Sequence, residues 1–210
     1  MIAIIDYSMG NLRSVQKGFE NAGVGGVAIA RDAAVVSQAD GLVLPGVGAY
    51  RDAMLNLKKS GLLESILEKV EGGTPLLGIC LGMQLLMDSS LENGDYEGLG
   101  LVSGVCRPIP RVPGIKIPHI GWNTVDYPGM TANPLFEGVP RDSAFYFVHS
   151  YYCDLIREPD VIGRVEYGSM LPCALNHGNL YGVQFHPEKS STLGLRMLSN
   201  FGAIVSGRSN

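Results

Sequence analysis

The chain has 210 residues, of which 46% are hydrophobic and 17% are charged, and its formal net charge is −4. This length and composition predict one folded domain with a large core. The acidic balance, with no basic run, argues against nucleic-acid binding and against a polybasic membrane surface. The longest apolar stretch is shorter than the ~18 residues that a membrane span needs. Because no signal peptide is recognisable, we expect a cytoplasmic protein.

The number and spacing of the cysteines predict free thiols and no disulfide bonds. The four cysteines are far apart and form no CxxC pair: Cys80, Cys106, Cys153 and Cys173. Without an export signal we expect free thiols, and the spacing does not match a zinc site. Three of the cysteines are expected to be small core residues. Neither a metal nor a cofactor is expected.

The first half of the chain alternates between strand-like and helix-like segments. Strands are predicted over 2–6, 27–30, 41–46 and 74–80, and helices over 11–23, 32–39, 50–71 and 82–90. Asp32 is expected to cap its helix, and Gly61 to interrupt the helical region 50–71. This alternation, with nearly continuous apolar strands, predicts an open, mostly parallel sheet with helices on both faces.

The second half contains shorter β-rich runs separated by prolines and glycines. They span 100–106, 117–127, 144–155, 161–167 and 173–186. Antiparallel strands are expected here, with a turn at the HGN sequence of 177–179. A final helix is predicted over 192–207. No repeat or linker is visible, so the prediction is a single α/β domain, residues 1–210, with a mixed sheet and antiparallel additions in its C-terminal half.

The sequence GICLG places Cys80 between two glycines where a strand is expected to become a helix. This pattern is typical of a nucleophile elbow, with cysteine in place of serine. A helix N-terminus favours the thiolate, and the backbone N–H of Leu81 is suited to stabilise an oxyanion. Gln84 lies one helical turn further, so its amide is expected to reach back over the Cys80 pocket. The alternative interpretation is a buried structural thiol.

The sequence QFHPEKS offers a base for this thiol. In an extended segment, which Pro187 favours, His186 and Glu188 share one face, so the carboxylate can orient the imidazole. His119 and His149 are alternatives, but neither has a carboxylate two residues away. His119 is expected to be structural or to face a partner, and His177 to be solvated in its turn.

A third segment, LPGVGAY, follows a buried strand. Gly46 and Gly48 permit unusual φ angles and a close approach of substrate. The backbone amides around Val47 and Gly48 are therefore candidates for a second oxyanion donor. A tight strand-to-helix turn without any catalytic role is the alternative.

Together, GICLGMQLL, LPGVGAY and QFHPEKS resemble the class I (triad) glutamine amidotransferases. DYSMGNLRSV, PHIGWN and FYFVHSYY are similar to the glutaminase subunits of imidazole glycerol phosphate synthases, over nearly the whole chain. Ser8 departs from this pattern, because the family usually has glycine at that position. The resemblance implies a triad of Cys80 as nucleophile, His186 as acid and base, and Glu188 as its orienter.

The resemblance also implies the remaining site residues. Val47 and Gly48 match the oxyanion strand, Gly82 and Gln84 match positions that hold glutamine, and Ser150 and Tyr151 match positions that bind its amino-acid end. The positions that match a partner interface are Asn11, Trp122, Tyr146 and Lys189. From the residues alone, these four are equally compatible with a loop amide, a core or interface tryptophan, a strand tyrosine and a solvated lysine.

The implied activity is hydrolysis of L-glutamine to glutamate and ammonia through a cysteine thioester, in histidine biosynthesis. No phosphate-cradling GxxxxGK loop is present, so the ammonia acceptor must bind to another chain. The resemblance identifies that partner as a cyclase subunit with a (β/α)8-barrel fold, forming a heterodimer. Three alternatives remain: the glutaminase subunit of another amidotransferase, a stand-alone γ-glutamyl cysteine hydrolase, and a non-catalytic scaffold subunit.

Overall fold

The computed structural model describes residues 1–127 and 133–207, and its first half follows the predicted alternation. The elements are β1 (Ile2–Ile5), α1 (Leu12–Asn21), β2 (Val27–Ala30), α2 (Ala33–Ser37), β3 (Gly41–Gly46), α3 (Tyr50–Lys59), α4 (Leu63–Glu71), β4 (Leu76–Cys80) and α5 (Leu81–Leu85). The side chain of Asp32 accepts a hydrogen bond from the Val35 amide and caps α2. Gly61 lies between α3 and α4 with φ +73°, so the predicted interruption is confirmed.

The second half continues with strands and one long helix. The elements are β5 (Met87–Ser90), β6 (Tyr96–Glu97), β7 (Val102–Pro108), β8 (His119–Asp126), η1 (Pro134–Phe136), β9 (Ala144–His149), β10 (Tyr151–Leu155), η2 (Glu158–Asp160), β11 (Val161–Glu166), β12 (Met170–His177), β13 (Leu180–Val183), η3 (Pro187–Lys189) and α6 (Ser191–Val205). The predicted HGN turn joins β12 to β13 as an antiparallel pair.

One large mixed sheet organises these elements, as predicted. Its nine strands lie in the order β2-β1-β3-β4-β13-β12-β11-β8-β9. From β2 to β13 every neighbouring pair is parallel, and from β13 to β9 every pair is antiparallel. β13 therefore joins the two halves of the sheet. Its pairing with β4 places a segment from the C-terminal half beside Cys80.

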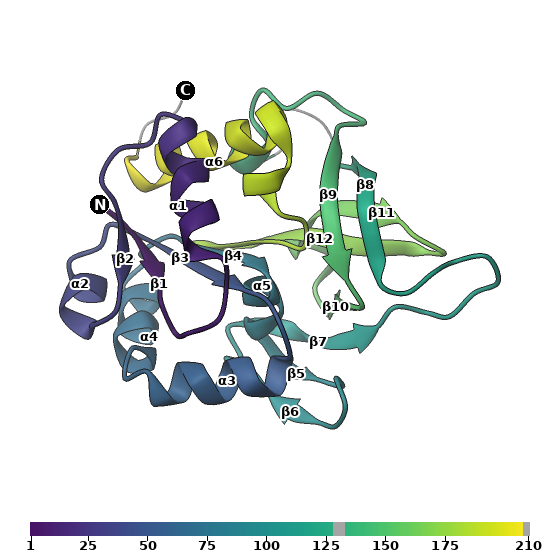
Figure 1. The fold of residues 1–210 in the computed structure, drawn as a ribbon, viewed down its shortest axis with the longest axis horizontal. Helices are drawn as coiled ribbons and strands as arrows, with labels where there is room; N and C mark the ends of the chain where they lie inside the picture. Colours follow the sequence, from purple (N-terminus) through teal and green to yellow (C-terminus); the bar gives the residue numbers. More distant parts are fainter. Residues whose placement is uncertain (128–132, 208–210) are drawn as a thin grey trace.

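Helices cover both faces of the parallel part of the sheet (Figure 1). Ile4 packs on the face covered by α1 and α6, with Phe19 and Phe201. The next residue, Ile5, packs on the opposite face with residues of α2, α3, α4 and α5. Successive strand residues point to opposite faces, so a continuous apolar strand fills two separate hydrophobic clusters. This explains the absence of polar alternation in β1, β3 and β4.

A second sheet was not predicted. It contains four strands in the order β10-β7-β5-β6. The helix predicted over 82–90 is wrong in its second half, because α5 ends at Leu85 and β5 begins at Met87. Met87 pairs with Val102 of β7, so a long-range strand contact overrides the local helical pattern.

The run 144–155, predicted as one strand, is two strands in different sheets. β9 ends at His149 and pairs with β8, whereas β10 begins at Tyr151 and pairs with β7. Ser150 is the only residue between them. The chain therefore passes from the large sheet to the small sheet at a position that sequence analysis assigns to substrate binding.

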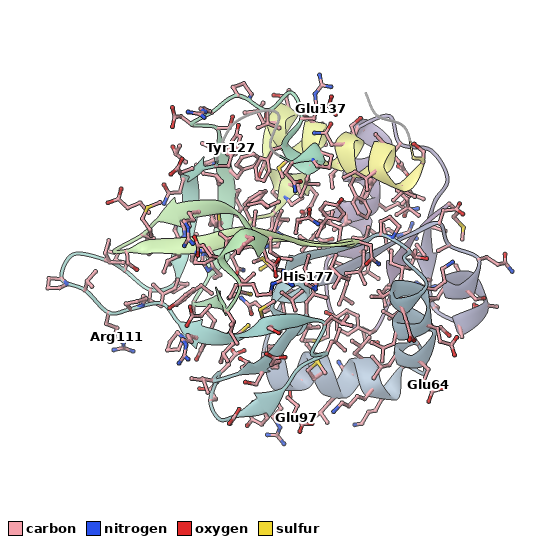
Figure 2. All side chains as sticks on the ribbon, turned by 180° about the vertical axis from the view of Figure 1, so that it is seen from behind. Glu64, Glu97, Arg111, Tyr127, Glu137 and His177 are labelled. Atoms are coloured by element: carbon pink, nitrogen blue, oxygen red, sulfur yellow. The ribbon has the colours of Figure 1, made fainter. Side chains whose placement is uncertain are left out.

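Several charged side chains lie on the outside of the molecule. Figure 2 shows Glu64 on α4, Glu97 on β6 and Arg111 in the loop before β8 at the outer edges of the molecule. No helix in residues 1–127 and 133–207 is both long enough and apolar enough to cross a membrane. Ser8 has a φ of 65°, in the region that favours glycine.

Candidate active site

Cys80 lies at the tip of a sharp turn between β4 and α5. Its backbone has φ 55° and ψ −111°, a strained conformation for a residue with a Cβ atom. A Cβ atom on Gly78 would lie 2.7 Å from the amide nitrogen of Met83, and one on Gly82 would lie 1.7 Å from the Leu44 carbonyl oxygen. The two glycines therefore allow the helix to start directly against the sheet. This local geometry agrees with the predicted elbow.

His186 and Glu188 form a buried pair beside this turn. His186 Nδ1 lies 2.8 Å from Glu188 Oε1, and the two side chains are only 4% and 1% exposed. The backbone of His186 is extended, and Pro187 begins the one-turn helix η3. The His186 amide donates to the Tyr146 carbonyl oxygen at 2.9 Å, which ties this segment to β9. The spacing of two residues therefore produces the predicted contact.

The environment of His186 favours its protonated form. Burial by itself lowers the pKa of His186, but hydrogen bonding and charge interactions with Cys80 and Glu188 outweigh burial and raise the pKa to about 9. Nε2 of His186 is buried and has no hydrogen-bond partner within normal distance and angle limits among the described residues. Such a nitrogen is available to exchange a proton with a reacting group.

Cys80 and His186 line one cavity of about 330 Å³. The other lining residues are Val47, Gly48, Leu81, Gln84, Glu92, Pro118, Val148, His149, Ser150 and Tyr151. The cavity lies beyond the carboxyl ends of the parallel strands β3 and β4, where open α/β sheets bind ligands. Most of the predicted catalytic and substrate-binding residues therefore surround one space.

Two of the predicted catalytic and substrate-binding residues do not line this cavity. Glu188 lies behind the His186 ring, where an orienting carboxylate belongs. Gly82 faces the Leu44 carbonyl group, so its position explains the tight turn and not a substrate contact. Gln84 does line the cavity, but both N–H bonds of its side-chain amide are used: Nε2 donates to the Tyr151 carbonyl oxygen at 3.2 Å and to Gln184 Oε1 at 3.0 Å.

Sequence analysis missed Glu92. This residue follows β5, and its Oε2 accepts a hydrogen bond from the Tyr50 amide at the start of α3, at 2.7 Å. It is the only acidic side chain among the residues that line the cavity. No motif marks it, because only the unpredicted strand β5 brings this loop to the cavity.

The other histidines have structural partners. His119 is buried and stacks on Phe147 and Tyr167, with ring centroids 4.7 and 3.8 Å away. Of its two predicted roles, structural or facing a partner, this packing agrees with the structural one. His149 lines the cavity and contacts His119. His177 lies at the predicted turn with a side chain that is 37% exposed, so it is partly solvated, and its Nδ1 also lies 3.0 Å from Asp160 Oδ2.

The four predicted interface residues lie near the catalytic segment or at the start of α1. Trp122 on β8 is 55% exposed, and its ring contacts that of Tyr146 on β9 edge to face, at 6.2 Å. Lys189 is exposed on η3. Asn11 accepts a hydrogen bond from the Ser14 amide and caps α1.

Comparisons with known proteins agree with this fold. The family model described as "Glutamine amidotransferase class-I" matches residues 3–205. A solved structure titled "Crystal structure of glutamine amidotransferase" superposes with a TM-score of 0.75 at 18% identity, covering 99% of this chain and 100% of that one. The structure of PurLQS from Thermotoga maritima gives a TM-score of 0.70 at 18% identity, over 98% and 97% of the two chains. The chain is a class-I glutamine amidotransferase.

Two curated relatives are much more similar. The imidazole glycerol phosphate synthase subunit HisH of Moorella thermoacetica is 51% identical, over 97% of this chain and 95% of its own length. The subunit HisH of Syntrophotalea carbinolica is 48% identical, over 96% of this chain and 99% of its own. Within the class, the chain belongs to the HisH family.

Proposed function

We propose that this chain is the glutaminase subunit of an imidazole glycerol phosphate synthase. It hydrolyses L-glutamine to glutamate and ammonia and delivers the ammonia to a cyclase subunit. The observation that carries the proposal is that Cys80 and His186 face one cavity of about 330 Å³ while Glu188 binds the far side of the imidazole. We further propose that residues 1–210 form a single domain and that the protein is located in the cytoplasm.

In the first half of the reaction, the Cys80 thiolate attacks the side-chain carboxamide carbon of glutamine. The Leu81 amide and an amide of the Val47–Gly48 segment stabilise the tetrahedral oxyanion, and losing one such donor costs about 3–4 kcal/mol. The C–N bond then breaks, and protonated His186 donates its Nε2 proton to the departing nitrogen. The products are ammonia and a γ-glutamyl thioester on Cys80.

In the second half, water hydrolyses the thioester. Neutral His186 accepts a proton from the attacking water, and the C–S bond breaks to release glutamate and regenerate the thiolate. Glu188 keeps the proton of neutral His186 on Nδ1, so that Nε2 is the nitrogen that faces the reaction. The sum is one glutamine and one water converted to one glutamate and one ammonia.

Polar groups in the cavity wall bind the amino-acid end of glutamine. The α-ammonium group needs an anionic or carbonyl acceptor, and Glu92 supplies the only carboxylate in the cavity lining. Gln84 contributes its Oε1, because both of its N–H bonds are already used. Ser150 and Tyr151 hold the α-carboxylate through backbone groups, at the point where the chain passes between the two sheets.

The ammonia must reach a second active site before water protonates it. The relatives are named as subunits of a synthase, which supports a partner subunit for this chain as well. The proposed partner is a (β/α)8-barrel cyclase, bound through the surface of Asn11, Trp122, Tyr146 and Lys189. The exposed Trp122 ring, which contacts the half-buried Tyr146 ring, supplies the kind of aromatic anchor that protein interfaces use.

The test combines the chain with its candidate cyclase subunit. Glutamate production is measured with and without the cyclase substrate, for the wild type and for Cys80→Ala. We expect glutamate release to rise when partner and substrate are present and to vanish in Cys80→Ala, while synthesis from added ammonia continues. Full-rate glutamine hydrolysis by the chain alone would instead indicate a stand-alone hydrolase. Glutamate release by Cys80→Ala would contradict the proposed nucleophile.

A further inference from the structure

Gln184 is a buried residue with a direct contact to the candidate nucleophile. Its side chain is fully inaccessible to solvent, and its Nε2 lies 3.6 Å from Cys80 Sγ. The two residues are far apart in the sequence, but β13 pairs with β4 so that Val183 is opposite Ile79. One residue further along the chain, Gln184, which directly follows β13, lies beside Cys80, the last residue of β4. Neither the catalytic steps nor the substrate contacts described above use this residue.

The direction of the Gln184 amide is fixed by its neighbour Gln84. Gln84 Nε2 donates one N–H to the Tyr151 carbonyl oxygen, at 3.2 Å. Because a carbonyl oxygen only accepts, this contact fixes which end of the Gln84 amide is the nitrogen. The second N–H then points to Gln184 Oε1 at 3.0 Å, and that oxygen must be the acceptor. Gln184 Nε2 is therefore the end that faces sulfur, and it can only donate.

A donor aimed at sulfur favours the charged form of the thiol. A thiolate accepts hydrogen bonds strongly, and a hydrogen bond to the charged form of a group stabilises that form over the neutral one. The neutral thiol has its own partner, since Sγ can donate to the Val148 carbonyl oxygen at 3.9 Å. The two protonation states of Cys80 thus have different hydrogen-bond partners. Gln184 donates to the ionised sulfur, whereas the neutral thiol donates to the Val148 carbonyl oxygen.

We propose that Gln184 is a catalytic hydrogen-bond donor that holds Cys80 as the thiolate, and that Gln84 is a positioning residue that keeps this donor correctly turned. The inference rests on the proposed function, because it requires Cys80 to be the nucleophile. Gln84 also lines the substrate cavity. A glutamine molecule that contacts Gln84 therefore influences the orientation of the group that ionises the sulfur, which links substrate binding to nucleophile activation.

Several other titratable groups surround Cys80, and the test must separate Gln184 from them. His186 follows the same strand, His149 ends β9, Tyr7 follows β1, and Glu92 lies in the cavity wall. His186 is the cation of the site and stabilises the thiolate by charge. Gln184 is uncharged, so its substitution by methionine changes the number of donors at sulfur without changing the net charge of the cavity.

The rate of alkylation of Cys80 by iodoacetamide reports the thiolate directly. We would measure it from pH 5 to 9 on the whole chain by mass spectrometry of the Cys80 peptide. Gln184→Glu keeps an oxygen for Gln84 but places an acceptor against sulfur. For this variant, we expect the midpoint of the pH dependence of Cys80 alkylation to lie about one pH unit higher than in the wild type. Alkylation at pH 7 should then be slowed about tenfold. Gln184→Met and Gln84→Met should shift the midpoint in the same direction by less.

A matched control separates this effect from loss of stability. Asn179 donates two partly buried amide N–H bonds, to the carbonyl oxygens of Val70 and Thr74 at 2.9 and 2.8 Å, at the opposite end of β13 from Gln184. Asn179→Asp should lower the thermal midpoint of unfolding but leave the alkylation midpoint at the wild-type pH. An alkylation midpoint that moves as far in Asn179→Asp as in Gln184→Glu would overturn the inference.

The outcomes also distinguish this inference from the proposed function. If Gln184→Glu does not fold, Gln184→Met decides, because methionine fills a similar volume without a charge. An unchanged midpoint in the folded Gln184 variants overturns the role of Gln184 and leaves Cys80 as the nucleophile. If wild-type Cys80 is alkylated no faster than Cys106 and Cys173, whose thiol pKa values burial raises well above the usual range, the proposed function itself fails.

Discussion

His119 Nδ1 and His149 Nε2 lie 2.9 Å apart, so the two rings share one hydrogen bond inside the protein. His149 Nδ1 is also 2.9 Å from the Tyr151 carbonyl oxygen, and a carbonyl oxygen only accepts. The proton of neutral His149 must therefore lie on Nδ1, its Nε2 accepts, and His119 Nδ1 donates. This chain of contacts orients the Tyr151 carbonyl group, which also binds Gln84.

The first prediction is a loss of stability in mild acid. Burial lowers the pKa of His119 and of His149 to about 4, whereas a histidine in the unfolded chain titrates near pH 6.5. The unfolded state therefore binds more protons in this window, and the free energy of unfolding should decrease as the pH falls from about 6.5 towards 4. Chemical denaturation at pH 7, 6 and 5 measures this slope.

The variant His119→Phe tests the source of the slope. Phenylalanine keeps the stacking between Phe147 and Tyr167 but removes one titrating ring. Its free energy of unfolding should be lower at pH 7, because His149 Nε2 loses its partner, but should depend less on pH between 6.5 and 5. A wild-type stability that is constant over this range would show that the buried pair does not titrate as described.

The second prediction concerns the charge coupling between Cys80 and His186. In the wild type the interactions of His186 with Cys80 and Glu188 overcome burial and raise its pKa to about 9. Cys80→Ala removes the interactions with the sulfur atom that raise this pKa, so the pKa of His186 should fall below about 9. An NMR titration of the imidazole resonances measures this change. The His119 signal is an internal control and should keep a pKa of about 4.

An unchanged pKa of His186 in Cys80→Ala would mean that Glu188 alone determines its protonation. The nucleophile and base would then be adjacent without forming an ion pair. In that case a neutral thiol would have to be activated only after glutamine binds.

The third prediction concerns Glu92 as a substrate contact. Glu92→Gln keeps a carbonyl oxygen that can accept from the Tyr50 amide but removes the negative charge from the cavity. KM for glutamine should rise about tenfold or more, as expected for loss of a charge-assisted hydrogen bond, with a smaller effect on kcat. Steady-state glutamate release in the complex provides both constants. Equal KM values for variant and wild type would exclude a contact between Glu92 and the α-ammonium group.

The fourth prediction concerns the glycine after the elbow. A Cβ atom at position 82 would lie 1.7 Å from the Leu44 carbonyl oxygen, so Gly82→Ala must move α5 away from β3. We expect it to lower the free energy of unfolding by about 3 kcal/mol, the upper end of the cost of overpacking a core. Gly25→Ala is the control, because no atom lies within 4 Å of its Cβ position. Denaturant unfolding that gives equal stabilities for the two variants would contradict this account.

The local elements of the site could be predicted from the sequence. The apolar run before Cys80, the flanking glycines and the two-residue spacing of His186 and Glu188 are short-range features, and each produces the expected geometry. The error over 82–90 has a physical cause. Met87 faces the core at a helical spacing from Met83, but its backbone pairs with Val102 in the second sheet. A strand partner in another part of the chain leaves no mark on local periodicity.

The sequence by itself determined the local geometry of the candidate catalytic residues, because the elbow and the histidine–carboxylate spacing depend on backbone geometry over a few residues. Only the tertiary structure decided what surrounds them. The pairing of β13 with β4 brings Gln184 to the sulfur atom, and β5 brings Glu92 to the cavity. Such contacts depend on strand order and register, which arise when the whole core packs and which no single segment encodes.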